Sequence, residues 1–164
     1  MSEASSKSSI DFFIKELKEA KPSPGGGAVA ALAGALGMAL IVKVANFSIG
    51  KKRYEKHERE IKSILLEADG LRGELSLFIE KDAKAYKEYS LTKSAASMKK
   101  ATQCMVNVSR LSSKGLKFCW RLERIGNVNL KGDLYVAERL LNSSIKSADN
   151  LSRLNKKTSS RNDG

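Results

Sequence analysis

The sequence is poor in aromatic residues and proline, and both shortages narrow the class of structure. Only 6% of the 164 residues are aromatic, so the core must be built from Leu, Ile, Val and Ala, a composition that favours closely packed helices. Both prolines lie between Lys21 and Gly25, so the regularly spaced turns of a β-sandwich are missing. We therefore expect one all-α domain over residues 1–164, with an ordered core from about residue 9 to about residue 155 and frayed tails.

Cysteine and histidine are too scarce for the usual metal sites. Cys104 and Cys119 are the two cysteines, and we expect them to pack in the core. The lone histidine, His57, lies in a charged run and is expected at the surface, which gives little support to a His-based metal site or a Ser-His-Asp triad. No bound metal is therefore predicted. Trp120 is expected to pack. The first nine residues lack the apolar stretch of a secretion signal, so a soluble, cytoplasmic protein is predicted.

Charge is strongly asymmetric along the chain. The formal net charge is +12, and residues 93–164 carry 15 Lys and Arg against 5 Asp and Glu. Such a surplus can mark a nucleic-acid surface, a site for a small anion, or a solvated surface. A basic helical module that binds nucleic acid through residues 93–161 is therefore one hypothesis. It is not the preferred one, because base-stacking aromatic residues and known binding motifs are absent.

Apolar periodicity predicts five helices. Their approximate ranges are Ser9–Ala20, residues 28–42, Tyr54–Tyr89, Ser94–Leu122 and Lys131–Leu154. Ser8 and Asp11 are spaced like a capping box at the first helix. The tail from Lys156 onward is expected to fray.

Residues 28–42 contain nothing more polar than glycine. A membrane-spanning helix needs about 20 such residues, whereas Lys43 ends this run at fifteen. We expect instead a helix buried on all sides, with Ala30, Ala33, Gly34 and Gly37 allowing close approach of neighbouring backbones. That much burial in a short chain predicts a second subunit.

Two features of the sequence can carry chemistry. Gly25, Gly26 and Gly27 open the apolar helix, where unpaired backbone N–H groups can hold a ligand, although a flexible connector is the alternative. They match neither a phosphate-binding loop nor a dinucleotide fingerprint. Asp82 lies on the apolar stripe of the third helix rather than on its charged face. A carboxylate in that position either transfers protons with a raised pKa or forms a buried ion pair.

Four blocks of sequence then follow one another along the chain: Pro22–Ala31 (PSPGGGAVAA), Asn46–Tyr54 (NFSIGKKRY), Asp82–Tyr86 (DAKAY) followed by Leu91–Lys93, and Gly126–Ala137 (GNVNLKGDLYVA). In residues and order they resemble the formimino-tetrahydrofolate cyclodeaminase and methenyl-tetrahydrofolate cyclohydrolase family. The resemblance extends from about Ile10 to about Asn155. One block alone would be weak, but four in the same order are a specific signal.

The resemblance implies a multihelical bundle that interlocks with a second copy as a homodimer. It implies chemistry at the carbon between N5 and N10 of tetrahydrofolate. The cyclodeaminase closes the bridge of formimino-tetrahydrofolate with loss of ammonia, and the cyclohydrolase opens the methenyl bridge with water. Asp82 would be the acid/base. No cofactor beyond the tetrahydrofolate substrate, no membrane and no nucleic acid are expected.

The resemblance also implies a set of substrate-binding residues. Lys51 and Lys93 would meet the glutamate or polyglutamate tail of the folate. The full set is Gly25, Gly26, Gly27, Lys51, Tyr54, Tyr86, Lys93, Asn127 and Asp133.

The chain departs from the family pattern at several positions. Ala28 replaces a serine, Thr92 replaces a proline, and Leu151 stands at the first asparagine of a late pair whose second is Asn155. The last helix of the family is replaced by a Lys/Ser tail. These departures leave open a third hypothesis, a catalytically altered relative that binds folate.

Overall fold

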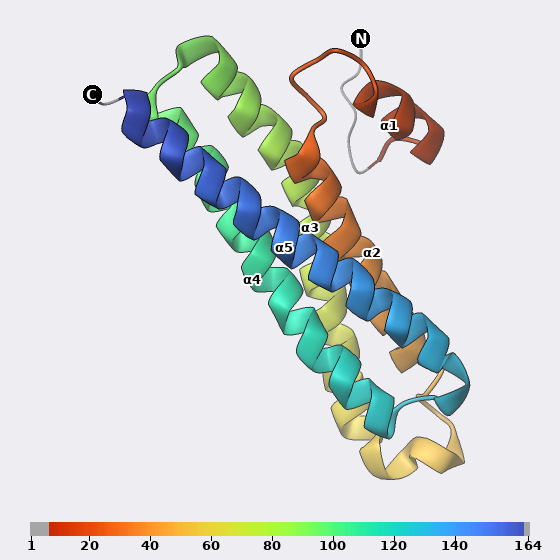
Figure 1. Cartoon of the computed structure of the whole chain (residues 1–164). Helices are drawn as coiled ribbons and strands as arrows, with labels where there is room; N and C mark the ends of the chain where they lie inside the picture. Colours follow the sequence, from red (N-terminus) through yellow and green to blue (C-terminus); the bar gives the residue numbers. More distant parts are fainter. Residues whose placement is uncertain (1–6, 163–164) are drawn as a thin grey trace.

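The computed structural model describes the backbone of residues 7–162 and the side chains of residues 7–158, a range that is helical and contains no strand. The predicted all-α class is confirmed. The five α-helices are α1 (Ile10–Leu17), α2 (Gly26–Asn46), α3 (Glu58–Thr92), α4 (Ala95–Ile125) and α5 (Lys131–Asn162), with short 3-10 helices η1 (Lys52–His57) and η2 (Val128–Leu130). Helices α2 to α5 form one elongated bundle, and α1 lies beside the beginning of α2 (Figure 1).

Each helix differs from its predicted range at one end or both, and α2 for example spans Gly26–Asn46 instead of residues 28–42. Two of these differences concern the predicted cap and the predicted tail. Ser9, not Ser8, caps α1, because its Oγ accepts a hydrogen bond from the Phe12 N–H at 3.2 Å. Helix α5 continues to Asn162, so the tail predicted to fray from Lys156 is helical as far as that residue. The reason is local, because residues 156–162 contain no proline or glycine that would interrupt the helix.

The predictions for four single residues can be compared with the exposure of their side chains. His57 is exposed and Cys119 is buried, as predicted, whereas Cys104 is only partly buried. The expectation that Trp120 packs in the core is wrong, because its side chain is 53% exposed. Its indole N–H instead points to Glu138 of the neighbouring helix, at 3.5 Å from Oε1.

Helix α2 packs closely against three other helices through its small residues. A Cβ added at Gly34 would lie 2.7 Å from Ser112 Oγ, and one added at Gly37 would lie 2.7 Å from Leu141 Cγ. The Ser144 hydroxyl donates to the Ala30 carbonyl at 2.7 Å and contacts Ser112 Oγ at 2.9 Å. The predicted close approach of backbones at Gly34 and Gly37 is therefore confirmed.

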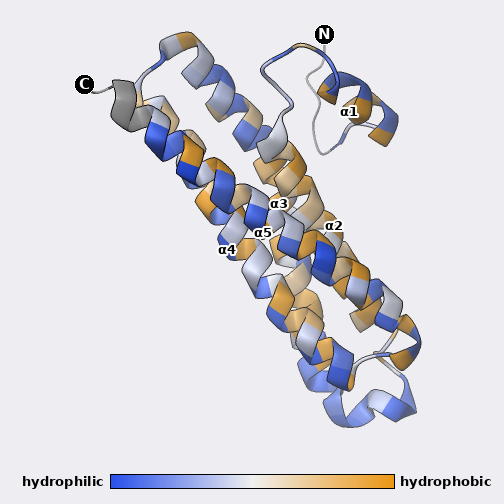
Figure 2. Ribbon diagram, viewed as in Figure 1, coloured by the Kyte–Doolittle hydropathy of each residue, from blue (hydrophilic) through white to orange (hydrophobic). Residues whose placement is uncertain are grey.

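The outer side of α2 is not covered by the rest of the chain. Val29 is 38% exposed and Leu36 is 48% exposed, so the expectation of a helix buried on all sides is wrong for the single chain. By length and composition α2 could cross a membrane, but 56% of its most apolar window is buried in the bundle. Figure 2 shows the ribbon of α2 largely in orange, the colour of hydrophobic residues.

The packing of α2 predicts opposite effects for two glycine-to-alanine substitutions. Gly37→Ala should destabilise the protein by about 1–3 kcal/mol, because its Cβ would also lie 3.1 Å from the Ala137 carbonyl oxygen, which belongs to backbone. Gly70→Ala in α3 has no atom within 4 Å of the added Cβ and should stabilise by about 0.5–1 kcal/mol. Urea unfolding of both variants measures the difference, and equal effects would contradict the packing described.

Candidate active site

Asp82 and the glycine run, predicted separately, lie against each other. A Cβ added at Gly27 would collide with both carboxylate oxygens of Asp82, so that carboxylate occupies the space over the first turn of α2. The Ala28 N–H donates a hydrogen bond to it. The carboxylate can lie this close to the backbone because glycine has no side chain, and the helix N-terminus stabilises its negative charge.

The surroundings of Asp82 favour its protonated form. The side chain is partly buried on the inner stripe of α3, and this burial is the larger effect on its pKa. The Ala28 N–H acts in the opposite direction, and the net result raises the pKa of Asp82 to about 6. A carboxyl group with that pKa can both accept and donate a proton near neutral pH.

Tyr86 and Lys93 continue along α3 beyond Asp82. Tyr86 lies one helical turn further on, is 44% exposed, and has its ring 6.3 Å from that of Tyr89. Lys93 ends the helix in a left-handed conformation with φ of 51°. Eleven residues separate it from Asp82, which corresponds to about 16 Å along the helix. Of these two predicted residues, Tyr86 is therefore the one close to Asp82.

A groove of about 440 Å³ lies next to Gly26, between α1, α2 and α5. Sequence reasoning missed its polar lining, Ser143, Ser147 and Asn150 of α5. The signal was present, because the four-residue steps from Ser143 to Ser147 and on to Leu151 place uncharged side chains on one face of an otherwise basic helix. The groove is lined by Leu17, Gly26, Val29, Ala30, Ala33, Ser143, Ser147, Asn150 and Leu151.

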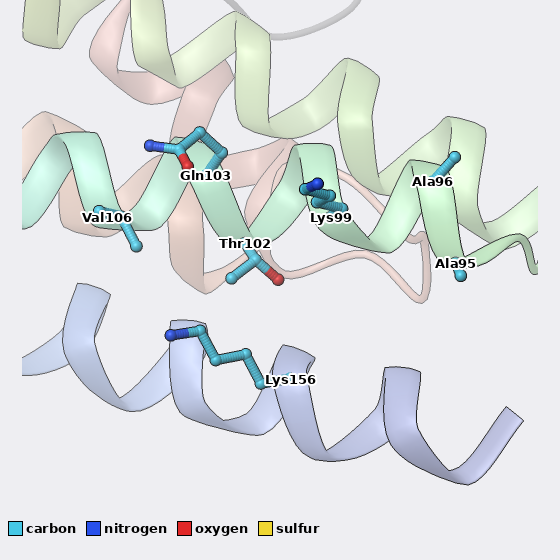
Figure 3. A pocket seen from close by; sticks show the side chains of 7 residues that line it. All are labelled: Ala95, Ala96, Lys99, Thr102, Gln103, Val106 and Lys156. Carbon is cyan, nitrogen blue, oxygen red and sulfur yellow. The ribbon is translucent and has the colours of Figure 1, made fainter. Parts of the chain in front are cut away.

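A second groove, of about 780 Å³, lies between the beginning of α4 and the end of α5. Lys99 and Gln103 border it from α4 and Lys156 from α5, with Thr102 and Val106 along its length (Figure 3). Its lining residues do not include Asp82 or the glycine run, so this groove is separate from the one beside Gly26.

The remaining predicted residues form a cluster at the other end of α2. The Ser48 hydroxyl accepts a hydrogen bond from the Asn127 N–H at 2.9 Å, and the Asn127 side-chain amide donates to the Phe47 carbonyl at 3.0 Å. The Tyr54 hydroxyl accepts from the Val128 N–H at 3.1 Å. The second and fourth sequence blocks thus fasten η1 and η2 to the end of α2, and we call this arrangement the clasp.

Asp133 and Lys51 also belong to this end. Asp133 forms an ion pair with Lys43 at 2.8 Å. The Gly50 N–H donates to Glu58 at 3.2 Å, which fixes the turn that carries the exposed Lys51. Within one chain the clasp is separated from Gly27 and Asp82 by most of α2, which is about 30 Å long. The structure therefore divides the predicted substrate-binding residues between the two ends of one helix.

The departures from the family pattern have local consequences. Ala28 lacks a hydroxyl, but its backbone N–H still reaches Asp82. Thr92 donates its hydroxyl to the Glu88 carbonyl at 2.9 Å and accepts from the Ser94 N–H at 3.3 Å, so it closes the turn between α3 and α4 without a proline. Leu151 lies beside Gly26 and lines the groove there, so an apolar side chain stands where the family pattern has an asparagine.

Among the side chains of residues 7–158, no group of three or more from His, Cys, Asp and Glu is placed to hold a metal ion.

Comparison with known proteins identifies a family. Residues 9–160 match the model of the family described as formiminotransferase-cyclodeaminase. Methenyltetrahydrofolate cyclohydrolase of Methylorubrum extorquens is 42% identical over 77 residues, which cover 47% of this chain and 37% of that protein. Formimidoyltransferase-cyclodeaminase of Gallus gallus is 26% identical over 149 residues, 81% of this chain and 28% of that protein. The chain thus matches only about a third of the length of these curated relatives.

A solved structure agrees with the same assignment. The crystal structure of formiminotetrahydrofolate cyclodeaminase from Thermotoga maritima superposes with a TM-score of 0.89 at 29% sequence identity. The match covers 92% of this chain and 79% of that one. The bundle described above is therefore the fold of that protein.

Proposed function

This chain belongs to the formiminotransferase-cyclodeaminase family, and on that premise we propose that it is a folate one-carbon enzyme with Asp82 as its acid/base. The observation that carries the proposal is the contact between Asp82 and Gly27 at the beginning of α2. It joins a proton-transfer group to a helix N-terminus that suits a polar ligand. The substrate is a tetrahydrofolate derivative with a one-carbon group on N5, or bridging N5 and N10, and its tail carries one or more glutamates.

Two reactions fit this site. In the cyclodeaminase reaction, N10 attacks the formimino carbon and loses its proton, after which the amino group gains a proton and leaves as ammonia. In the cyclohydrolase reaction, water adds to the methenyl carbon and loses a proton, and N5 regains one as its bond to that carbon breaks. Both require a group that first accepts and then donates a proton. A carboxyl group whose pKa is raised to about 6 is suited to both steps.

Each reaction is supported by a different relative. The solved structure that covers 92% of this chain is a cyclodeaminase, whereas the relative that is 42% identical over about half of the chain is a cyclohydrolase. These matches favour folate chemistry over the nucleic-acid hypothesis drawn from the charge. The cytoplasmic location, the absence of a further cofactor and the altered-relative hypothesis remain predictions.

The decisive assay follows the absorbance of 5,10-methenyl-tetrahydrofolate. Its enzyme-dependent loss, with formation of 10-formyl-tetrahydrofolate, establishes the cyclohydrolase. Its formation from 5-formimino-tetrahydrofolate, with release of one ammonia per turnover, establishes the cyclodeaminase. Folate binding without either conversion would support the altered relative, and absence of both binding and turnover would refute the proposal.

We further propose that the protein is a homodimer that pairs through the outer side of α2. A line of residues there follows steps of four and three, the spacing of a helix–helix seam. Lys43 is the one charged member, and Asp133 neutralises it. We call this line the α2 seam: Val29, Ala33, Leu36, Leu40, Lys43 and Phe47. An uncharged surface in a chain of net charge +12 suits another copy of itself better than an acidic partner.

A single charge in the seam should separate the subunits. Leu36 is the midpoint of α2 and is 48% exposed, so Leu36→Glu places two carboxylates at the centre of the interface and should convert the dimer to a monomer. Leu66→Glu is the control, because Leu66 is 74% exposed on α3 and lies outside the seam. Sedimentation of the wild type and both variants decides the matter. A monomeric wild type, or a dimeric Leu36→Glu, would contradict this interface.

A further inference from the structure

We propose that the groove between the beginning of α4 and the end of α5 binds a small organic anion that has an apolar body. This site is separate from the proposed reaction, because neither Asp82, the glycine run nor any residue of the groove beside Gly26 lines it. It also contains no member of the α2 seam, so the proposed dimer interface uses different residues.

The groove has the size of a small-molecule site. Its volume of about 780 Å³ lies within the range of about 300–1,000 Å³ that is usual for ligand pockets. One wall follows α4 from Ala95 to Val106, which corresponds to about 16 Å along the helix. Steps of three and four residues keep this lining on one face of α4. The lining residues of α4 are Ala95, Ala96, Lys99, Thr102, Gln103 and Val106.

The charged residues of the lining are all cationic. Lys99 borders the groove from α4 and Lys156 from α5, and among the described side chains no Asp or Glu lines it. Lys99 is exposed, and no acidic side chain of residues 7–158 forms an ion pair with it, whereas the adjacent Lys100 pairs with Glu88 at 2.8 Å. An anion can therefore bind at Lys99 without displacing an acidic side chain.

Apolar and neutral side chains complete the groove. Val106 is 38% exposed, and Thr102 and Val106 lie between α4 and α5 together with Lys156 (Figure 3). The Thr102 hydroxyl donates to the Met98 carbonyl at 2.9 Å, so it needs no hydrogen bond from a ligand. Burial of an apolar body against this wall and an ion pair with a lysine would stabilise the same complex.

Two other kinds of anion fit this lining less well. Inorganic phosphate would leave the apolar side chains of Ala95, Ala96 and Val106 in contact with water. A single-stranded nucleic acid would need aromatic side chains on which its bases stack, and the described lining contains none. An apolar wall with lysines on both sides therefore favours a carboxylate or sulfonate that is attached to a ring or an alkyl chain.

Binding of anilinonaphthalenesulfonate, a fluorescent aromatic anion, tests the site. The fluorescence of this probe increases when it moves from water to apolar surroundings. The full chain should bind about one molecule per subunit, and the affinity should decrease as salt is added, because salt screens the two lysines. Lys99→Glu should weaken binding by a factor of about ten or more, because it replaces an attraction with a repulsion at the wall.

Two variants serve as controls for position. Lys117→Glu makes the same charge change on an exposed residue of α4 outside the groove. Lys117 lies about 27 Å from Lys99 along the helix, which exceeds the screening length of about 10 Å in 0.1 M salt. Ser143→Glu adds a carboxylate to the groove beside Gly26. Both variants should bind the probe within about twofold of the wild type.

Val106→Glu tests the apolar wall independently of Lys99. A carboxylate there would face the body of the ligand and should also lower the affinity about tenfold, whereas Leu66→Glu, at an exposed position of α3, should leave it unchanged. Decanoate should displace the probe, and inorganic phosphate at the same concentration should not. Circular dichroism verifies that the variants remain helical. Wild-type affinity in Lys99→Glu or Val106→Glu, lost affinity in Ser143→Glu, displacement by phosphate, or no displacement by decanoate would overturn the proposal.

Discussion

Asp82→Asn should lower kcat by a factor of about 10² to 10⁴, the usual contribution of a positioned acid/base. The amide keeps the shape of the carboxyl group, and its oxygen can still accept from the Ala28 N–H. Folding and folate binding should therefore survive. The measurement is turnover of the methenyl or formimino substrate under saturating conditions. Full activity in this variant would show that another group transfers the proton.

The same carboxyl group should give the wild type a characteristic pH dependence. Proton removal from N10 or water needs the ionised form, so kcat/KM should fall about tenfold per pH unit below the pKa of about 6. In Asp82→Asn the residual activity should lack this step. A wild-type profile that is flat between pH 5 and pH 8 would contradict the role given to Asp82, whatever the effect of the substitution.

As the pH rises, the stability contributed by Asp82 should fall while the activity increases. The folded state raises the pKa of Asp82 from 3.8 to about 6, so the folded protein binds the proton more tightly than the unfolded chain. The contribution of Asp82 to the free energy of unfolding is then highest below pH 3.8 and decreases as the pH rises toward 6. Two pKa units correspond to about 3 kcal/mol. Asp82→Asn removes this penalty and should unfold at higher urea concentration than the wild type at pH 7.5, with little difference at pH 4.

Much of the fold follows from local pattern. Apolar residues at steps of three and four from Ile61 to Phe78, continuing to Asp82, predict both the helix and its inner face. Of these apolar residues, all are buried in the structure except Leu65, which is partly buried. Ser94 is an N-cap that sequence can identify, and its hydroxyl accepts from the Ser97 N–H at 3.2 Å. Periodicity predicts these features because the face that a helix buries is determined by the spacing of its own apolar residues.

Other features depend on partners that a sequence pattern does not specify. The apolar run of α2 predicted burial but not which side would remain uncovered, because that depends on where α3, α4 and α5 pack. Trp120 is apolar by type, yet it lies at the edge of α4 beside Glu138. Asn127 was predicted to line a folate pocket, but its side-chain amide is bound to the Phe47 carbonyl. A polar residue in a motif can serve the ligand or the fold, and only its contacts distinguish the two.

The glycine run also shows that a sequence pattern does not specify the contacts of each residue. It gives the second prediction with a large expected effect on activity. Sequence treats Gly25, Gly26 and Gly27 alike, whereas the structure gives them different surroundings. A Cβ at Gly26 would lie 3.8 Å from Leu151, an ordinary contact, and one at Gly27 would collide with the Asp82 carboxylate. Gly27→Ala must therefore displace the Asp82 carboxylate from the beginning of α2, while Gly26→Ala leaves it in place.

We expect Gly27→Ala to lower kcat by at least about a hundredfold, because a displacement of the order of 1 Å at a reacting group has an effect of that size. Gly70→Ala in α3, which has no atom within 4 Å of the added Cβ and lies outside the candidate site, is the control and should remain within about threefold of the wild type. Turnover of both variants, with circular dichroism to verify that they remain helical, makes the comparison. The double variant Gly27→Ala/Asp82→Asn adds a further constraint. If the glycine acts only through the carboxyl group, this variant should be about as active as Asp82→Asn alone. A further large loss would mean that the Gly27 backbone contacts the substrate directly.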